Sequence, residues 1–211
     1  MTAINFIYEE NQITIYMDTL SLDEKGRPFK YVSKLFPIPH LRSVICGTGN
    51  LDLIMDWVHQ VQRNVIAADI AYLSEITTEQ LIALQEKYPK DAGATTIYQF
   101  GYSQLVEKLK GYVYRSTKDF FQEEYDFCFG IKPEVDFDWD QEGKAGLDNA
   151  FINLMVKQKE IDDKNPNRVG IGGEIHKFIL NKDTYLLYTL HRFSDYESCY
   201  DEILKNLKSR S

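Results

Sequence analysis

The chain has 211 residues, with 24 Lys and Arg against 32 Asp and Glu, which gives a formal net charge of −8. Surfaces that bind duplex nucleic acid or anionic membranes are basic, so this charge argues against both kinds of partner. The N-terminus lacks the pattern of a signal peptide, and no stretch approaches the roughly 18 apolar residues that span a membrane. Three Cys (Cys46, Cys128 and Cys199) without framework spacing favour a reducing compartment. We therefore expect a soluble, cytoplasmic protein.

The first part of the chain is predicted to form antiparallel strands. Residues 3–8 are predicted to form one strand and residues 13–18, in which apolar and polar side chains alternate, a second; the short polar turn between them is typical of a hairpin. Two further extended segments are expected over residues 31–36 and 41–46, and the second runs into a glycine-rich turn at residues 47–50.

The hydrophobic period then changes to that of a helix. Apolar residues recur at helical spacing from Leu51 to Val65, and Asn50 stands where an N-cap is expected. Thr77 and Gln80 fit a capping box, which predicts that a second helix begins after Thr77.

The rest of the chain alternates strands and helices. The expected elements are strands over 95–102, 111–116 and 126–130, an acidic surface loop over 134–142, a helix over 147–161, a hairpin of strands 171–180 and 184–191, and a final helix over 196–207. Hairpins indicate antiparallel sheets with helices packed on their faces. The fold class is therefore α+β, a layered sandwich, and no linker divides the chain.

Three residues near the front have a regular spacing. Sixteen residues separate Thr2 from Asp18, and sixteen more separate Asp18 from Lys34. With the strand order and the turn at Gly47, this spacing resembles the proteasome β-subunit and HslV-type family of N-terminal nucleophile (Ntn) hydrolases. The resemblance is clear over about the first 65 residues. It implies a four-layer αββα sandwich and one such domain over residues 1–211.

The chemistry implied by the resemblance uses each of these residues. After removal of Met1, the Thr2 hydroxyl would attack an amide carbonyl while the free Thr2 amine acts as the base. Lys34 would disfavour the charged form of that amine, and Asp18 would compensate and orient Lys34. The backbone N–H of Gly47 would stabilise the oxyanion.

The function implied is a threonine-type peptidase or amidohydrolase acting on a peptide or amide substrate. No metal or organic cofactor is required by this chemistry. The resemblance also implies a homo-oligomer, in the form of a ring.

A second interpretation stays open, in which the chain is an inactive proteasome-like subunit that acts as a structural or binding scaffold. The family supports its nucleophile with a later Asp and a Ser-Gly-rich segment, and this chain has neither an Asp-x-x-Ser-Gly nor a Ser-Gly-Ser sequence. Asp18 and Lys34 would then form a purely structural ion pair.

Other patterns are better explained without a site. Asp52, Asp56 and His59 share one helix face, but a solvated polar face accounts for them better than a metal site. The aspartates at 136, 138 and 140 fail the calcium-loop pattern, and the glycines at 170, 172 and 173 are not followed by a phosphate-loop Lys-Ser/Thr.

A cysteine, two histidines and the strand aromatics are also expected to have structural roles. Cys46 is expected in the core, with a reactive thiol as the alternative. His176 and His191 are expected to be sheet residues. Strand aromatics such as Tyr98 and Phe129 are expected to pack the sheets, with a carbohydrate or peptide platform as the alternative.

Overall fold

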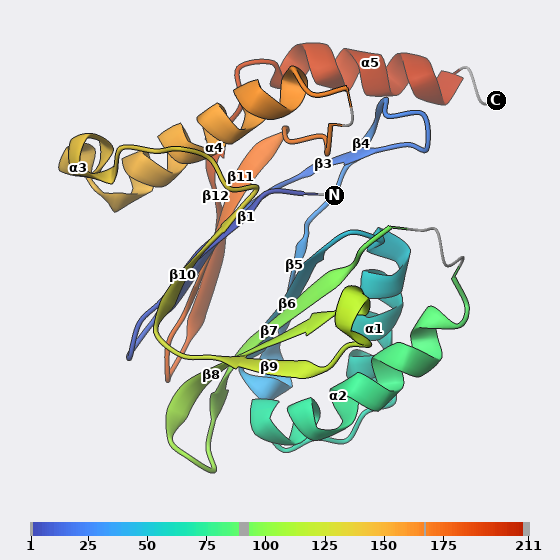
Figure 1. Cartoon of the computed structure of the whole chain (residues 1–211), viewed down its shortest axis with the longest axis vertical. Coiled ribbons are helices and arrows are strands. Elements are labelled where there is room, and N and C mark those ends of the chain that lie inside the picture. The colour runs from blue at the N-terminus through green and yellow to red at the C-terminus, as the bar shows by residue number, and fades with distance from the viewer. Residues whose placement is uncertain (1, 89–92, 167, 209–211) are drawn as a thin grey trace.

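The computed structural model of the chain describes residues 2–88, 93–166 and 168–208. Two five-stranded antiparallel sheets dominate it. The first has the order β10-β1-β2-β11-β12, and the second has the order β5-β6-β7-β8-β9. Helices cover the outer face of each sheet, so the layers run helix, sheet, sheet, helix (Figure 1). The expected α+β sandwich of antiparallel sheets is confirmed.

The element bounds are as follows. The first sheet contains β1 (Ile4–Tyr8), β2 (Ile13–Asp18), β10 (Cys128–Lys132), β11 (Glu174–Leu180) and β12 (Tyr185–Arg192). The second contains β5 (Leu35–Ile38), β6 (Ser43–Thr48), β7 (Thr96–Ser103), β8 (Lys108–Arg115) and β9 (Gln122–Tyr125). A two-stranded ribbon is formed by β3 (Leu20–Leu22) and β4 (Pro28–Tyr31).

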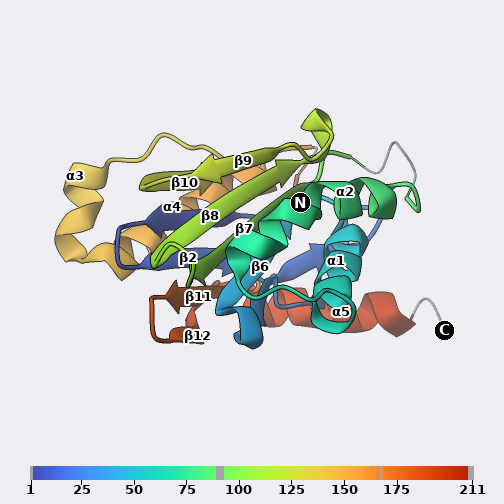
Figure 2. The same cartoon turned by 90° about the horizontal axis from the view of Figure 1, so that it is seen from below.

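The helices are divided between the two outer faces. The helices α1 (Leu51–Arg63) and α2 (Ile70–Gln85) lie against the second sheet. On the other side lie the short α3 (Trp139–Glu142) and the longer α4 (Leu147–Asp163) and α5 (Tyr196–Lys208), with α5 against β4 (Figures 1 and 2). Short 3-10 turns occupy Pro39–Leu41, Ser116–Lys118 and Gly143–Ala145.

The strands β1 and β2 are buried on both faces because the first sheet lies between the second sheet and α4. Their inward side chains, Phe6 and Ile15 among them, join an inter-sheet core that includes Phe100. On the opposite face, Tyr16 stacks on Phe151 of α4 with ring centroids 4.2 Å apart. Because β1 and β2 are buried on both faces, they fix the position of the N-terminal residues that directly precede β1.

Most expected elements are present, and the differences have local causes. The expected strand over 31–36 is interrupted, because β4 ends at Tyr31 and β5 begins at Leu35. The strand expected over 126–130 is β10, which begins two residues later, and β9, which precedes it in the other sheet, was not expected. The acidic segment 134–142 is a loop only up to α3.

The first two helices show one correct and one wrong prediction of a helix start. Asn50 caps α1 as expected, and its side-chain oxygen accepts from Asp52 N at 3.0 Å. The predicted start of α2 after Thr77 is wrong, because α2 begins at Ile70 with Asp69 as its cap. The Thr77 hydroxyl instead donates to the carbonyl of Leu73 at 2.8 Å within the helix.

No helix in the described part of the chain is long and apolar enough to cross a membrane.

Asp69 provides a pH-dependent contribution to stability. One carboxylate oxygen caps α2, while the other accepts from Ser103 Oγ and Gln104 N, both at 2.9 Å. Burial raises the pKa of Asp69, but these hydrogen bonds outweigh it and hold the pKa below its ordinary value of 3.8. A carboxyl with a lowered pKa stabilises the fold above its ordinary value and loses that contribution as the pH falls through the lower one.

We therefore expect Asp69→Asn to lower the free energy of unfolding by about 1–3 kcal/mol at pH 7 and by clearly less at about pH 3. Urea unfolding at both pH values measures this. Asn50→Ala is the matched control, since it removes a cap without a titrating group and should cost about 1 kcal/mol at both. If Asp69→Asn lowered the free energy of unfolding equally at both pH values, the carboxylate of Asp69 would not be the source of the pH dependence.

Candidate functional site

Thr2, Asp18 and Lys34 meet in a buried cluster where strands of the first sheet end. Lys34 Nζ donates to Thr2 Oγ1 at 2.5 Å and to Asp18 Oδ2 at 2.9 Å. The Thr2 hydroxyl in turn donates to Asp18 Oδ1. The side chain of Asp18 is fully buried and that of Lys34 is 7% exposed. The three residues singled out by their spacing are therefore in direct contact.

Lys34 is held as an ammonium by its acceptors. Besides Thr2 and Asp18, Nζ donates to the carbonyl oxygen of Leu20 at 2.6 Å. Three donated hydrogen bonds require the three protons of the charged form. Burial lowers the pKa of Lys34 below its ordinary value, and the carboxylate of Asp18 offsets only part of that shift. A fixed positive charge thus lies beside Thr2 Oγ1, where it favours a developing alkoxide and disfavours protonation of a nearby amine.

The antiparallel register of β1 and β2 brings Thr2 to Asp18. Ile4 pairs with Met17, so the residues just before β1 lie beside the end of β2. The backbone N–H of Ala3 donates to Asp18 Oδ1 at 2.9 Å, which fixes this entry into β1.

Lys34 reaches the cluster from the irregular segment between β4 and β5. This segment is tied to the end of β2 by a hydrogen bond from Val32 N to the carbonyl of Thr19, at 2.8 Å. The interruption of the expected strand is therefore what places Lys34 in the site.

A glycine-rich segment that leads into β11 closes the cluster from the other side. Gly172 N donates to Asp18 Oδ2 at 3.3 Å, and the Gly172 carbonyl accepts from Leu20 N at 3.0 Å. Gly173 has a positive φ of +79°, and a Cβ there would lie 2.4 Å from Thr19 Oγ1. From the sequence, these glycines were compared only with a phosphate loop and their place in the site was not predicted, although three glycines within four residues before a strand indicate close backbone approach.

Asp162, at the C-terminal end of α4, shapes that glycine-rich segment. Its buried carboxylate accepts from Val169 N at 2.6 Å, Gly170 N at 2.8 Å and Ile171 N at 3.1 Å. Because these backbone groups occupy the carboxylate, Asp162 acts on the site only by positioning the segment that contacts Asp18.

The cluster opens into a cavity of about 500 Å³, which Gly47 also lines. A Cβ on Gly47 would come within 2.7 Å of the Thr96 carbonyl oxygen and 2.9 Å of Ile54 Cδ1, so the close packing of β6 requires glycine here. Phe36 and Ile54 give the cavity an apolar part, and Thr48 and Asn50 give it polar groups. The arrangement offers space for a substrate beside Thr2.

The other candidates are placed elsewhere. Cys46 is fully buried in the inter-sheet core, and burial raises the pKa of its thiol. Asp56 accepts a hydrogen bond from Tyr88, and Asp138 caps α3. Within the described ranges, no group of three or more His, Cys, Asp or Glu side chains is arranged to hold a metal ion.

The histidines and Tyr98 take the expected positions in the sheets, whereas Phe129 does not pack into a core. His176 and His191 lie on β11 and β12, and the His176 ring lies 3.4 Å from the Glu174 carboxylate. Tyr98 belongs to the inter-sheet core, whereas Phe129 is 68% exposed.

Comparisons with known proteins show a structural likeness but no sequence relative. No family model matches the chain, and no curated protein matches its sequence. Among solved structures, it is similar to Anbu (ancestral beta-subunit) from Yersinia bercovieri, with a TM-score of 0.65 and 13% identity. The likeness covers 98% of this chain and 94% of that one. At this identity the comparison shows the fold alone, a layered sandwich that the two chains share.

The buried pair of Asp18 and Lys34 should be costly to break from one side. Asp18→Asn leaves the Lys34 ammonium without a compensating charge, and we expect the free energy of unfolding to fall by about 3–5 kcal/mol. Urea denaturation followed by circular dichroism measures the loss. The double variant Asp18→Asn with Lys34→Met should recover part of it, because no buried charge remains. An Asp18→Asn variant as stable as the parent would show that this ion pair contributes nothing to the free energy of unfolding.

The glycine-rich segment gives a steric test. In Gly173→Ala the new Cβ adds a clash with Thr19 and Tyr31 to the cost of a positive φ, so we expect a loss of about 2–4 kcal/mol in unfolding free energy. Gly93→Ala is the matched control, because Gly93 has a similar φ of +82° and open space around its Cβ position. It should lose only about 1–2 kcal/mol. Equal losses in chemical denaturation would show that close packing at Gly173 does not matter.

Proposed function

We propose that the chain is an amidohydrolase or peptidase of the N-terminal threonine type, with Thr2 as the nucleophile once Met1 has been removed. Met1 lies outside the described residues. The observation that carries the proposal is the contact of Thr2 Oγ1 with both Lys34 Nζ and the Asp18 carboxylate, at the edge of a cavity.

The reaction follows from these contacts. The free amine of Thr2 takes the hydroxyl proton as Oγ1 bonds to the carbonyl carbon of an amide, and the carbonyl oxygen becomes an oxyanion. The amine then returns the proton to the leaving nitrogen as the C–N bond breaks, which leaves an ester on Thr2. Water, deprotonated by the same amine, hydrolyses that ester and regenerates the hydroxyl.

Lys34, Asp18 and Gly47 have supporting roles in this proposal. The Lys34 charge beside Oγ1 favours the attacking alkoxide and keeps the amine neutral at moderate pH. Asp18 compensates Lys34 and fixes the Thr2 hydroxyl, and Gly47 N–H would donate to the oxyanion. A homo-oligomeric ring is part of the same proposal, since the fold is the proteasome-like one.

A second candidate function is that of an inactive scaffold subunit with this fold. The observation that favours it is the segment around Gly172, which brings backbone groups to Asp18 but no additional carboxylate to Thr2, because Asp162 is occupied by three backbone N–H groups.

Cleavage of a panel of fluorogenic peptide amides by protein whose intact mass shows loss of Met1 tests the proposal. Thr2→Ala should lower the rate by more than about 10³-fold, because the nucleophile is gone. Thr2→Ser is the matched control and should keep a measurable part of the activity, since it retains a hydroxyl. Activity that survives Thr2→Ala would rule out this mechanism. The absence of cleavage by correctly processed, folded protein would favour the scaffold.

A further inference from the structure

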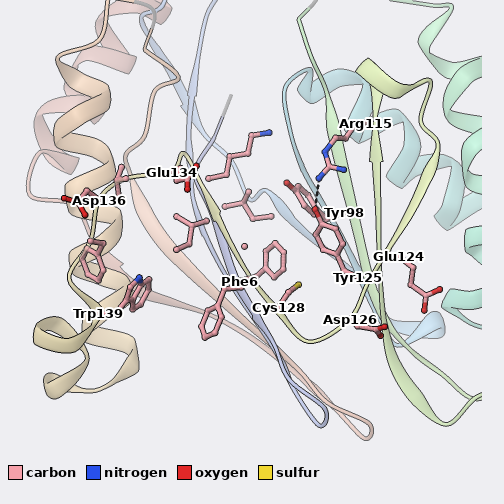
Figure 3. Close-up of a pocket in the computed structure, with 17 residues that line it drawn as sticks. Phe6, Tyr98, Arg115, Glu124, Tyr125, Asp126, Cys128, Glu134, Asp136 and Trp139 are labelled. Atoms are coloured by element: carbon pink, nitrogen blue, oxygen red, sulfur yellow. Dashed lines mark hydrogen bonds between the residues drawn. The ribbon is translucent and has the colours of Figure 1, made fainter.

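A second and larger cavity lies away from Thr2, in the wedge where the edges of the two sheets diverge. It is a groove of about 1200 Å³ between β10 with the segment after it on one wall and strands β7, β8 and β9 on the other (Figure 3). The chain crosses from β9 to β10 at one end of this groove. Its volume is somewhat above the roughly 300–1,000 Å³ typical of small-ligand sites, so it has room for a small organic molecule.

Lys132 presents an uncompensated positive charge to this groove. Its Nζ donates to Thr48 Oγ1 at 2.9 Å, which leaves two protons of the ammonium for other acceptors. In the described part of the chain it forms no ion pair with a carboxylate. Burial lowers the pKa of Lys132, and the charge of Arg115 lowers it further. A half-buried ammonium without a counter-charge is costly unless an anion binds to it.

Arg115 on β8 adds hydrogen-bond donors beside Lys132. Its guanidinium is paired with Glu123, and Nη2 donates to the hydroxyl of Tyr125 at 2.6 Å. Tyr125 accepts this bond, so its own proton is available to a ligand. Figure 3 shows Arg115, Tyr98 and Tyr125 together on one wall of the groove.

The balance of charge selects a monoanion. Glu123 offsets Arg115, so Lys132 leaves a net local charge of about one. Elsewhere the groove is lined by four acidic residues, Glu124, Asp126, Glu134 and Asp136, which would repel a phosphate dianion or a polyanion more strongly than a single carboxylate. The ligand's anionic group is therefore best matched by a single carboxylate.

The remaining lining suits an apolar or aromatic body. Phe6 and Ile4 form part of the inner surface, and Trp139 stands on the opposite wall in Figure 3. Trp139 packs against Phe137 with ring centroids 4.8 Å apart, which gives a rigid aromatic surface. We propose that this groove binds a small organic monocarboxylate, whose carboxylate lies between Lys132 and Arg115 and whose aromatic or aliphatic body lies against Trp139.

The test measures binding and does not depend on the proposed hydrolase activity, so the Thr2→Ala protein serves as well as the parent. N-acetyl-phenylalanine and 3-phenylpropionate are titrated into the full chain by isothermal titration calorimetry. Their uncharged amides and inorganic phosphate are titrated in parallel. We expect the carboxylates to bind at least about tenfold more tightly than the amides and than phosphate.

Two substitutions locate the site. Lys132→Met should weaken carboxylate binding by about tenfold or more, whereas Lys132→Arg should retain most of it. Lys108→Met, at an exposed position on β8, is the matched control and should leave binding unchanged. Thermal unfolding of each variant establishes that it is folded.

Three results would overturn the proposal. These are binding of neither carboxylate at millimolar concentration, equal binding of acids and amides, and a folded Lys132→Met protein with unchanged affinity. Tighter binding of inorganic phosphate than of the carboxylates would overturn the choice of ligand class.

Discussion

The structure around the candidate site depends on one buried charge, the ammonium of Lys34, and on the carboxylate that compensates it. An uncompensated ion in such a place would cost several kcal/mol, so Asp18 has to lie where it does. Asp18 also accepts backbone N–H groups from Ala3 and Gly172, which come from opposite sides of the cluster. The entry into β1, the end of β2 and the segment before β11 are thereby joined at one carboxylate.

This arrangement holds the Thr2 hydroxyl, the proposed nucleophile, without a long side-chain network. Thr2 Oγ1 is fixed by two charged partners, and each partner is in turn fixed by backbone hydrogen bonds or by burial. Positioning by strand ends places the hydroxyl at the rim of a cavity and not inside the sandwich core. A site held in this way can present a nucleophile to a substrate with little reorganisation.

The sequence predicted the elements that depend on neighbouring residues alone, such as the first hairpin and α1. The apolar run of β1 and the alternation along β2, separated by a polar turn, predicted that hairpin, and the Asn50 cap with the apolar stripe after it predicted α1. The predicted start of α2 was wrong because a Thr hydroxyl can cap a helix or hydrogen-bond to a carbonyl inside one. The packing of Ile70 and Leu73 on the sheet decides between these two roles. The regular spacing of Thr2, Asp18 and Lys34 was visible, but their contact requires the register of three separate segments.

Features built from distant segments could not be predicted in this way. Gly172 lies 154 residues from Asp18, and nothing in the local pattern connects them. The lining of the larger groove likewise combines β1 and β10 of the first sheet with β7, β8 and β9 of the second, so it has no sequence signature. Burial of the Asp162 carboxylate by three backbone groups is also a tertiary outcome, since an acidic residue near a helix end is usually solvated.

Lys34 and Lys132 show how the same side chain acquires different chemical uses within one sandwich. Thr48, on β6, borders both environments, since it lines the Thr2 cavity and accepts a hydrogen bond from Lys132. Lys34 has all three protons engaged and a carboxylate beside it, so its charge is a fixed part of the structure. Lys132 has one proton engaged by a neutral hydroxyl, so its charge is left for a ligand to neutralise. The counter-charge, more than burial or residue type, therefore separates a lysine that organises a site from one that can bind an anion.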